Sequence, residues 1–376
     1  MTDPTLVLAT SAKRSEYKRD FLTCLASPDG HRVAFSYKKH WFDPALLQGL
    51  VGREAVIVFS EPHAHQSRFS FLAVRHVTIR SLVPASTQTL LQSTAITVEF
   101  ILGRLVGVDD DELTRRRPQW QNAITGVPGH PGSSAAPDRF VFEVPELGEN
   151  RDIDPATSWR TLSVALGGCQ TLRDAFFFRV GTVRRPPPRT VFRDPTTHLP
   201  VGGAPPQPVE AETVTIESFG ALSQVYQLAT STDYELPLDA YSPSGDVPYS
   251  QAIATTSSSD SLTVQAVTQS AAGRASQAVL VIRTGEVFRP EIGTVIICGA
   301  PSFEHRVPRV EIAAEVSRNM LMVAAITVGI AVSVFAAGLA KGTFGASEGL
   351  SYAINIVGSL SAALLALLAI GRGVTK

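Results

Sequence analysis

The hydrophobic pattern divides the chain into a long body of short apolar segments and a C-terminal stretch of two much longer ones. Residues 320–340 carry no charged side chain, and residues 351–370 contain only serines, Tyr352 and Asn355 as polar members. A helix of about 20 mostly apolar residues crosses a hydrocarbon core roughly 30 Å thick. Backbone groups in lipid must be bonded within their own segment, so each run is predicted to be helical. The sequence therefore predicts a two-helix transmembrane hairpin within residues 319–376.

Residues 1–107 are predicted to form a small β-barrel-like module. Continuous or alternating apolar segments typical of strands occur at Thr5–Ala9, Arg32–Tyr37, Glu54–Phe59, Phe69–Arg80 and Ala95–Leu102. Helical spacing of apolar side chains is confined to Ser15–Ala26 and Asp43–Leu50. Several strands with few helices favour a small, mostly antiparallel barrel or sandwich.

A second β-rich module is predicted over residues 138–300. Residues 108–137 form the linker before it, with a charge block followed by a run rich in Gly, Pro and Ser. Strand segments are expected at Arg139–Val144, Trp159–Ala165 and Ala175–Val183, and again up to Thr294–Cys298, after a proline-rich insertion at 184–208. Regular short strands with turn signals favour a β-sandwich. The sequence leaves open whether the module is one domain or two, and the short stretch before the insertion favours one.

Basic residues around the hairpin predict its orientation. A juxtamembrane segment, 301–318, precedes the first span and carries three arginines; two basic residues follow the second span, and only Lys341 lies between the spans. The flanking residues are Arg306, Arg309, Arg318, Arg372 and Lys376. Positive charge is retained on the cytoplasmic side, so both termini and the whole β-rich body are predicted to be cytoplasmic, at the inner membrane of a cell.

Composition narrows the class of protein further. The formal net charge is −1, so no overall excess of basic residues indicates nucleic acid as a partner. The three cysteines, Cys24, Cys169 and Cys298, lie far apart and show no zinc-binding or dithiol spacing. The N-terminus lacks the basic and apolar regions of a signal peptide. A disulfide-stapled exported protein is therefore not expected.

The sequence shows no motif typical of a catalytic site. The phosphate-loop, dinucleotide, metalloprotease, nucleophile-elbow and CxxC patterns are all missing, so an enzyme is not predicted and no cofactor is expected. His63 and His65, with Glu61 nearby, are weak metal candidates, because alternate residues of an extended segment project to one side. The simpler interpretation is two exposed histidines in a turn, and no metal site is predicted.

A basic and aromatic groove is the candidate ligand site. Arg75, His76 and Arg80 lie on one alternating segment, and basic and aromatic residues follow an earlier strand; the full set is Lys38, Lys39, Trp41, Arg75, His76 and Arg80. Such side chains bind phosphates and flat bases. The alternative is the solvated face of a half-buried sheet. A second candidate surface is the docking motif formed by Arg184, Arg185 and Arg189 around three prolines.

Small residues recur every four positions on both hairpin helices. They would let helices approach closely, and Asn355 would seek a polar partner within lipid; the packing residues are Gly329, Ser333, Ala337, Asn355, Gly358 and Ala362. The two helices of one chain can pack in this way, or hairpins of several chains can form a homo-oligomer.

Three classes of function fit this architecture. The first, which we predict, is a membrane-anchored cytoplasmic binding or scaffold protein whose β-rich modules recognise a protein partner or a small ligand. The second is a ligand-gated bacterial membrane effector whose hairpin oligomerises or disrupts the bilayer; its architecture is similar to that of bacterial defence effectors, although no motif carries the likeness. The third is an enzyme with an unrecognised site.

Overall fold

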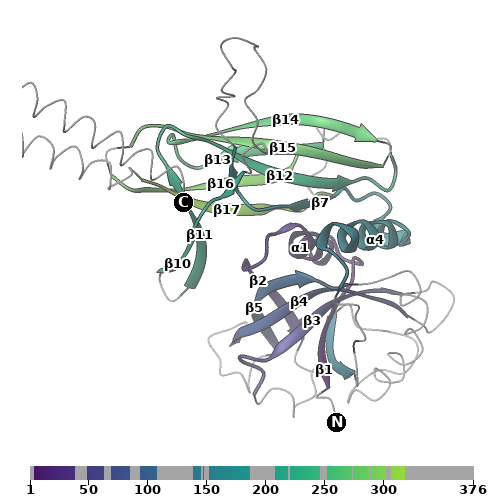
Figure 1. Cartoon of the computed structure of the whole chain (residues 1–376). Helices are drawn as coiled ribbons and strands as arrows, with labels where there is room; N and C mark the ends of the chain where they lie inside the picture. Colours follow the sequence, from purple (N-terminus) through teal and green to yellow (C-terminus); the bar gives the residue numbers. More distant parts are fainter. Residues whose placement is uncertain are drawn as a thin grey trace, which may run out of the picture.

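The computed structural model of the chain describes residues 4–38, 49–62, 69–84, 94–107, 139–144, 147, 152–186, 208–218, 221–245, 252–272, 274–287, 289–301 and 306–317. Within these residues the protein is mainly β, and its strands form three sheets (Figure 1). The predicted β-rich body is thus confirmed. None of the described helices combines the length and apolar character needed to cross a membrane, and the predicted hairpin lies outside the described ranges.

The first sheet holds six strands in the order β2-β5-β4-β3-β1-β6. They are β1 (Thr5–Thr10), β2 (Arg32–Lys38), β3 (Glu54–Pro62), β4 (Phe69–Pro84), β5 (Ala95–Leu105) and β6 (Arg139–Val144). β1 and β3 are parallel, and the other neighbours are antiparallel. The apolar run of β1 is buried on both faces of the sheet. β6, which the sequence analysis assigned to the second module, pairs with β1 along its whole length, so the chain returns to this sheet after residues 108–137.

The first sheet is curled, and the buried side chain of Arg139 joins its two edge strands. In a flat sheet of this size, β2 and β6 would lie about 24 Å apart at ~4.8 Å per strand. Arg139 of β6 nevertheless donates to the Ser36 carbonyl of β2 at 3.5 Å and stacks over the Phe35 ring at 4.5 Å. The same guanidinium lies 3.9 Å from the centre of the Tyr17 ring and 2.9 Å from Asp20, both on helix α1 (Ser15–Ala26). The sheet is therefore strongly curved, and α1 lies at its seam.

The other two sheets pack face to face around one hydrophobic core. One contains β10 (Thr213–Ser218), β11 (Ala221–Ala229), β17 (Val310–Ser317), β16 (Glu291–Gly299) and β13 (Ile253–Ser257), in that order. The second contains β14 (Leu262–Ala272), β15 (Ala275–Thr284), β12 (Asp233–Tyr241), β8 (Arg184–Arg185) and β9 (Val209–Glu210), and β7 (Phe177–Val180) also pairs with β12. Leu236 of β12 and Leu280 of β15 share a core with Ile297 of β16 and Ile312 of β17. The arrangement is that of a β-sandwich.

The ends of the proline-rich insertion meet on the sandwich. Arg184 pairs with Glu210 and Arg185 with Val209, so the chain leaves and re-enters the sheet at one point. The guanidinium of Arg184 also lies 3.5 Å from the Glu235 carboxylate of β12. Two arginines of the predicted docking motif therefore belong to a strand, and Arg189 lies outside the described residues.

The prediction of a strand at Trp159–Ala165 is wrong, because these residues belong to helix α4 (Pro155–Gly167). The helix is followed by the 3-10 turn η4 (Gln170–Leu172). The carboxylate of Asp154 accepts hydrogen bonds from the first free N–H groups of the helix, and Pro155 supplies a first-turn residue that needs no partner. Trp159, Leu162 and Leu166 then recur at helical spacing and are buried.

Helix α1 agrees with the predicted Ser15–Ala26, whereas most of the helix expected at Asp43–Leu50 lies outside the described residues. Figure 1 shows α1 and α4 between the curled sheet below and the sandwich above. The two cores overlap in this layer: Ala26 of α1 belongs to the core of the sandwich, and Tyr241 of β12 belongs to the core of the curled sheet. The helices are therefore the joint between the two β units.

Polar contacts also cross the joint. The Thr23 hydroxyl of α1 accepts from the Arg309 N–H, just before β17, at 3.3 Å. His31 Nε2 donates to the Glu311 carbonyl of β17 at 2.9 Å. Burial lowers the pKa of His31, so its imidazole is neutral at pH 7, in agreement with a buried Nδ1 that has no partner among the described residues.

The C-terminal turn of α1 is held by the buried guanidinium of Arg75. It donates to the carbonyls of Cys24 at 2.8 Å, Ser27 at 2.6 Å and Gly103 at 2.7 Å, and it pairs with Asp29 at 2.5 Å. The last carbonyls of a helix have no partner within the helix, and a cation also suits its negative end. Only 2% of the Arg75 side chain is exposed, so its hydrogen bonds to the carbonyls are shielded from water, whereas the Asp29 side chain is 67% exposed and its ion pair with Arg75 is screened by solvent.

We expect Arg75→Met to lower the free energy of unfolding by about 3–5 kcal/mol, because it leaves the buried carbonyls of Cys24, Ser27 and Gly103 without a donor. Denaturant unfolding of the purified full chain measures the change. Arg80→Met is the matched control: Arg80 is an exposed residue of the same strand, and its replacement should change stability by less than about 0.5 kcal/mol. Equal effects of the two substitutions would contradict the role of Arg75.

Candidate functional site

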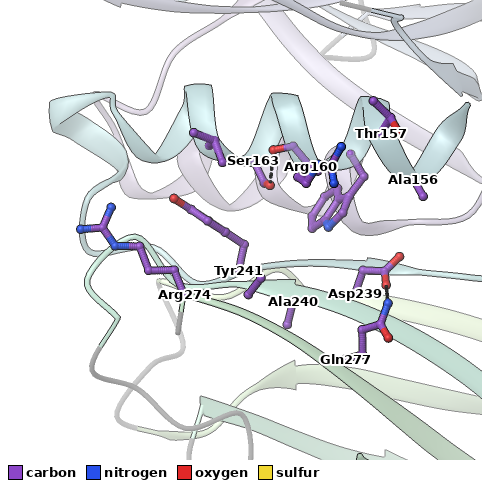
Figure 2. A pocket seen from close by; sticks show the side chains of 12 residues that line it. Ala156, Thr157, Arg160, Ser163, Asp239, Ala240, Tyr241, Arg274 and Gln277 are labelled. Carbon is purple, nitrogen blue, oxygen red and sulfur yellow. Dashed lines mark hydrogen bonds between the residues drawn. The ribbon is translucent and has the colours of Figure 1, made fainter. Parts of the chain in front are cut away.

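A cleft lies between helix α4 and strands β12 and β15 (Figure 2). Its volume is about 880 Å³, within the range of roughly 300–1,000 Å³ that is typical of small-molecule sites. It opens at the joint between the two β units, and such junctions are common binding positions. The lining residues are Ala156, Thr157, Trp159, Arg160, Ser163 and Val164 of α4, and Asp239, Ala240, Tyr241, Arg274, Ala275 and Gln277 across from it.

Arg179 of β7 fixes one end of the cleft. Its guanidinium donates to the Pro155 carbonyl at 2.9 Å and to the Asp239 carboxylate at 3.2 Å, so it ties the start of α4 to β12. It also lies 6.0 Å from the centre of the Trp159 ring. Gln277 donates to the second carboxylate oxygen of Asp239 at 3.3 Å. Asp239, the only carboxylate among the described residues that line the cleft, therefore has partners for both oxygens.

At the other end, α4 approaches the sheet through a glycine. A Cβ atom at Gly167 would lie 2.8 Å from Cε1 of Tyr241 and 3.2 Å from Cγ of Pro243. Tyr241 has no room to retreat, because it is buried and its ring stacks on Phe177 at a centroid distance of 6.1 Å. The helix is thus fixed to the sheet at both ends, and the cleft occupies the space between.

Two arginines give the cleft a positive character. Arg160 and Arg274 are exposed, and neither has a carboxylate within ion-pair distance in the described part of the chain. The Tyr241 hydroxyl likewise has no hydrogen-bond partner there, and Figure 2 shows it pointing toward α4. The acidic group at the N-cap of the helix, Asp154, is engaged there: hydrogen bonds from Thr157 and the helix N–H groups lower its pKa, and the charge of Arg160 adds a smaller lowering without an ion pair. Donors therefore outnumber free acceptors along the cleft.

The residues of the predicted basic groove do not all share one surface. Arg75 is buried and bound to carbonyls, so it lines neither an open groove nor a solvated face. Irregular register in β4, on both sides of Val77, changes the simple alternation. Lys38 and Arg80 are exposed and His76 is half-buried, whereas Lys39 and Trp41 lie outside the described residues. Ligand binding by this set stays a prediction.

The other candidate residues fall largely outside the described ranges. These are the weak metal candidates His63 and His65, and the hairpin packing residues Gly329, Ser333, Ala337, Asn355, Gly358 and Ala362. Glu61 is described, and its carboxylate accepts from the N–H and hydroxyl of Thr171, which ties β3 to η4. Within the described residues, no three His, Cys, Asp or Glu side chains gather as a metal site would require.

Cys24 is not a nucleophile in the folded protein. Burial raises the pKa of its thiol to about 12, so the reactive thiolate is not populated at neutral pH. The charge of Arg75 lowers this pKa, but by less than burial raises it. The buried cysteine therefore belongs to the packing of α1.

Sequence reasoning missed the cleft because it missed α4. The signal was present: Asp154 and Pro155 precede three apolar residues at helical spacing, which is a typical helix start. The opposite wall could not be found in this way, because Asp239 and Arg274 are far apart in sequence and come together only through the pairing of β12 with β15.

Comparison of the chain with protein-family models, curated proteins and solved structures finds no match.

We expect Gly167→Ala to destabilise the protein by about 1–3 kcal/mol, because the new methyl group would overlap the Tyr241 ring. This loss would outweigh the roughly 1 kcal/mol by which alanine favours a helix over glycine. Gly168→Ala is the matched control, since a Cβ there meets only the carbonyls of its own helix, at 3.3 Å and beyond. Thermal unfolding compares the two variants; a Gly167 variant as stable as the Gly168 variant would show that α4 does not rest on Tyr241.

Proposed function

We propose that the chain is a membrane-anchored binding protein, in which the β-rich body carries the binding site and residues 319–376 attach it to the bilayer. The observation that carries the proposal is the pairing of two uncharged spans, 320–340 and 351–370, with a body that has a positively charged cleft between its two units. The flanking basic residues favour a cytoplasmic body at the inner membrane. A small ligand or a protein partner then binds on the cytoplasmic side.

The connection between body and anchor is short. β17 ends at Ser317, and only Arg318 and Asn319 separate it from the first uncharged span. Three peptide steps cover at most about 10 Å when extended. With residues 320–340 in the bilayer, this short connection would keep the C-terminal end of β17 close to the lipid headgroups.

A ligand-gated membrane effector is the second candidate, and the path from cleft to anchor favours it. The chain segment that leads into the hairpin, 306–317, bonds to Thr23 of α1 and to His31, which follows α1. The same layer contains α4, which forms one wall of the cleft. A ligand that moved α4 would thus act close to the strand that enters the membrane, and the hairpin would respond by oligomerising or disturbing the bilayer.

Membrane fractionation of cells that express the full chain tests the anchor. We expect the full chain to resist extraction by carbonate and to require detergent, whereas a chain truncated after residue 318 should be released into the soluble fraction. Because truncation can impair folding, Ile330→Arg with Leu364→Arg serves as a second variant, since each buried charge disfavours insertion by about 2.5–3.5 kcal/mol. Soluble full-length protein, or a truncated chain that stays in the membrane, would sink the proposal. Dye leakage from vesicles on ligand addition would favour the effector over the tethered binder.

A further inference from the structure

We propose that the cleft between α4 and β12 binds a small organic anion that joins a flat ring to a phosphate group, the chemistry of a nucleoside monophosphate. The inference rests on the proposed binding function and names the ligand class for its site. Three features of the cleft carry it: two arginines without an ion pair among the described residues, an apolar wall, and its size.

The charge of the cleft selects an anion. Asp239 has both carboxylate oxygens occupied by Arg179 and Gln277, so it offers no free acceptor to a cation. Arg160 of α4 and Arg274, the residue before β15, line the cleft from its two walls, and neither has an ion pair with a carboxylate in the described structure. Guanidinium groups match phosphate oxygens in geometry and form charge-assisted hydrogen bonds with them. The Tyr241 hydroxyl adds a neutral donor on the same side.

The apolar lining selects a ring. Half of the lining residues are apolar or aromatic: Ala156, Trp159, Val164, Ala240, Tyr241 and Ala275. Val164 is 53% exposed although it belongs to a packed helix, and an apolar ring in the cleft would cover it. A bare inorganic anion would leave this wall in contact with water, so it should bind less tightly than an anion that carries a ring.

The size of the cleft limits the ligand to a small molecule. A volume of about 880 Å³ accommodates one nucleotide-sized compound with water around it. Both ends are closed by contacts between helix and sheet, at Arg179 and at Gly167. A peptide or nucleic-acid strand that ran along α4 would meet these contacts, so an extended polymer is not the expected occupant.

Titration of the full chain in mild detergent with adenosine 5′-monophosphate tests the inference. Saturation-transfer nuclear magnetic resonance detects weak binding, and adenosine and inorganic phosphate serve as the uncharged and ringless comparisons. We expect the monophosphate to bind at least about ten-fold more tightly than either, because two charge-assisted hydrogen bonds and the apolar wall act together. Raising the salt concentration should weaken its binding and leave that of adenosine unchanged.

Substitutions locate the binding in the cleft. Arg160→Gln and Arg274→Gln should each weaken monophosphate binding about ten-fold and leave adenosine unaffected, whereas Arg80→Gln, at an exposed arginine of the curled sheet, should have no effect. Both cleft arginines are exposed, so unfolding of the variants is not expected, and their thermal transitions check this.

Three results would overturn the inference: no monophosphate binding at millimolar concentrations, adenosine binding as tightly as the monophosphate, or unchanged binding in both cleft variants. The same experiments distinguish failure of this inference from failure of the proposed function. A chain that needs detergent for extraction but does not bind the monophosphate would support the anchor and contradict this ligand class. A soluble chain that binds the monophosphate would support the ligand class and contradict the anchor.

Discussion

The buried guanidinium of Arg75 is the interaction on which the joint between the two β units depends. It donates to carbonyls at the end of α1 in a place that solvent does not reach, and it also pairs with the exposed carboxylate of Asp29. Without that cation, the last turn of α1 would carry buried carbonyls with no partner. The chain from Thr23 to His31 follows directly and makes the contacts to β17 and its preceding loop. One side chain from the curled sheet therefore fixes the element on which the sandwich rests.

The second buried arginine, Arg139, has a complementary role. It bridges β2 and β6, the two edges of the curled sheet, and its guanidinium lies between the rings of Tyr17 and Phe35. Arg75 and Arg139 thus hold opposite ends of α1 against the same sheet. Because α1 is fixed at both ends, it supports α4 and the sandwich in one position. This explains why a cleft can persist between elements that come from different units.

The sequence predicted those parts of the fold that follow from local pattern. The strands around Leu6, Phe35, Ile57 and Val98 and the helix at Ser15–Ala26 all appear, because apolar periodicity directly reflects burial. It missed what depends on distant pairing. Arg75 was assigned to a groove because nothing in its own segment reveals the distant carbonyls of Cys24 and Ser27 that bind it, and β6 joins the first sheet across an insertion that was interpreted as a domain boundary. Predicting the cleft would have required both helix α4 and the pairing of β12 with β15. Only α4 has a local signal in the sequence.

The central claim is that the curled sheet, the helix layer and the sandwich form one structural unit around the cleft. Pulsed hydrogen exchange during denaturant unfolding, read separately on peptides from β1 and from β16, tests it most directly. Ala26 of α1 packs in the core of the sandwich, and Tyr241 of β12 packs in the core of the curled sheet. The two peptides should therefore lose protection at the same denaturant concentration. Two well-separated midpoints would contradict the claim and would make the joint, and the cleft within it, a contact between independent domains.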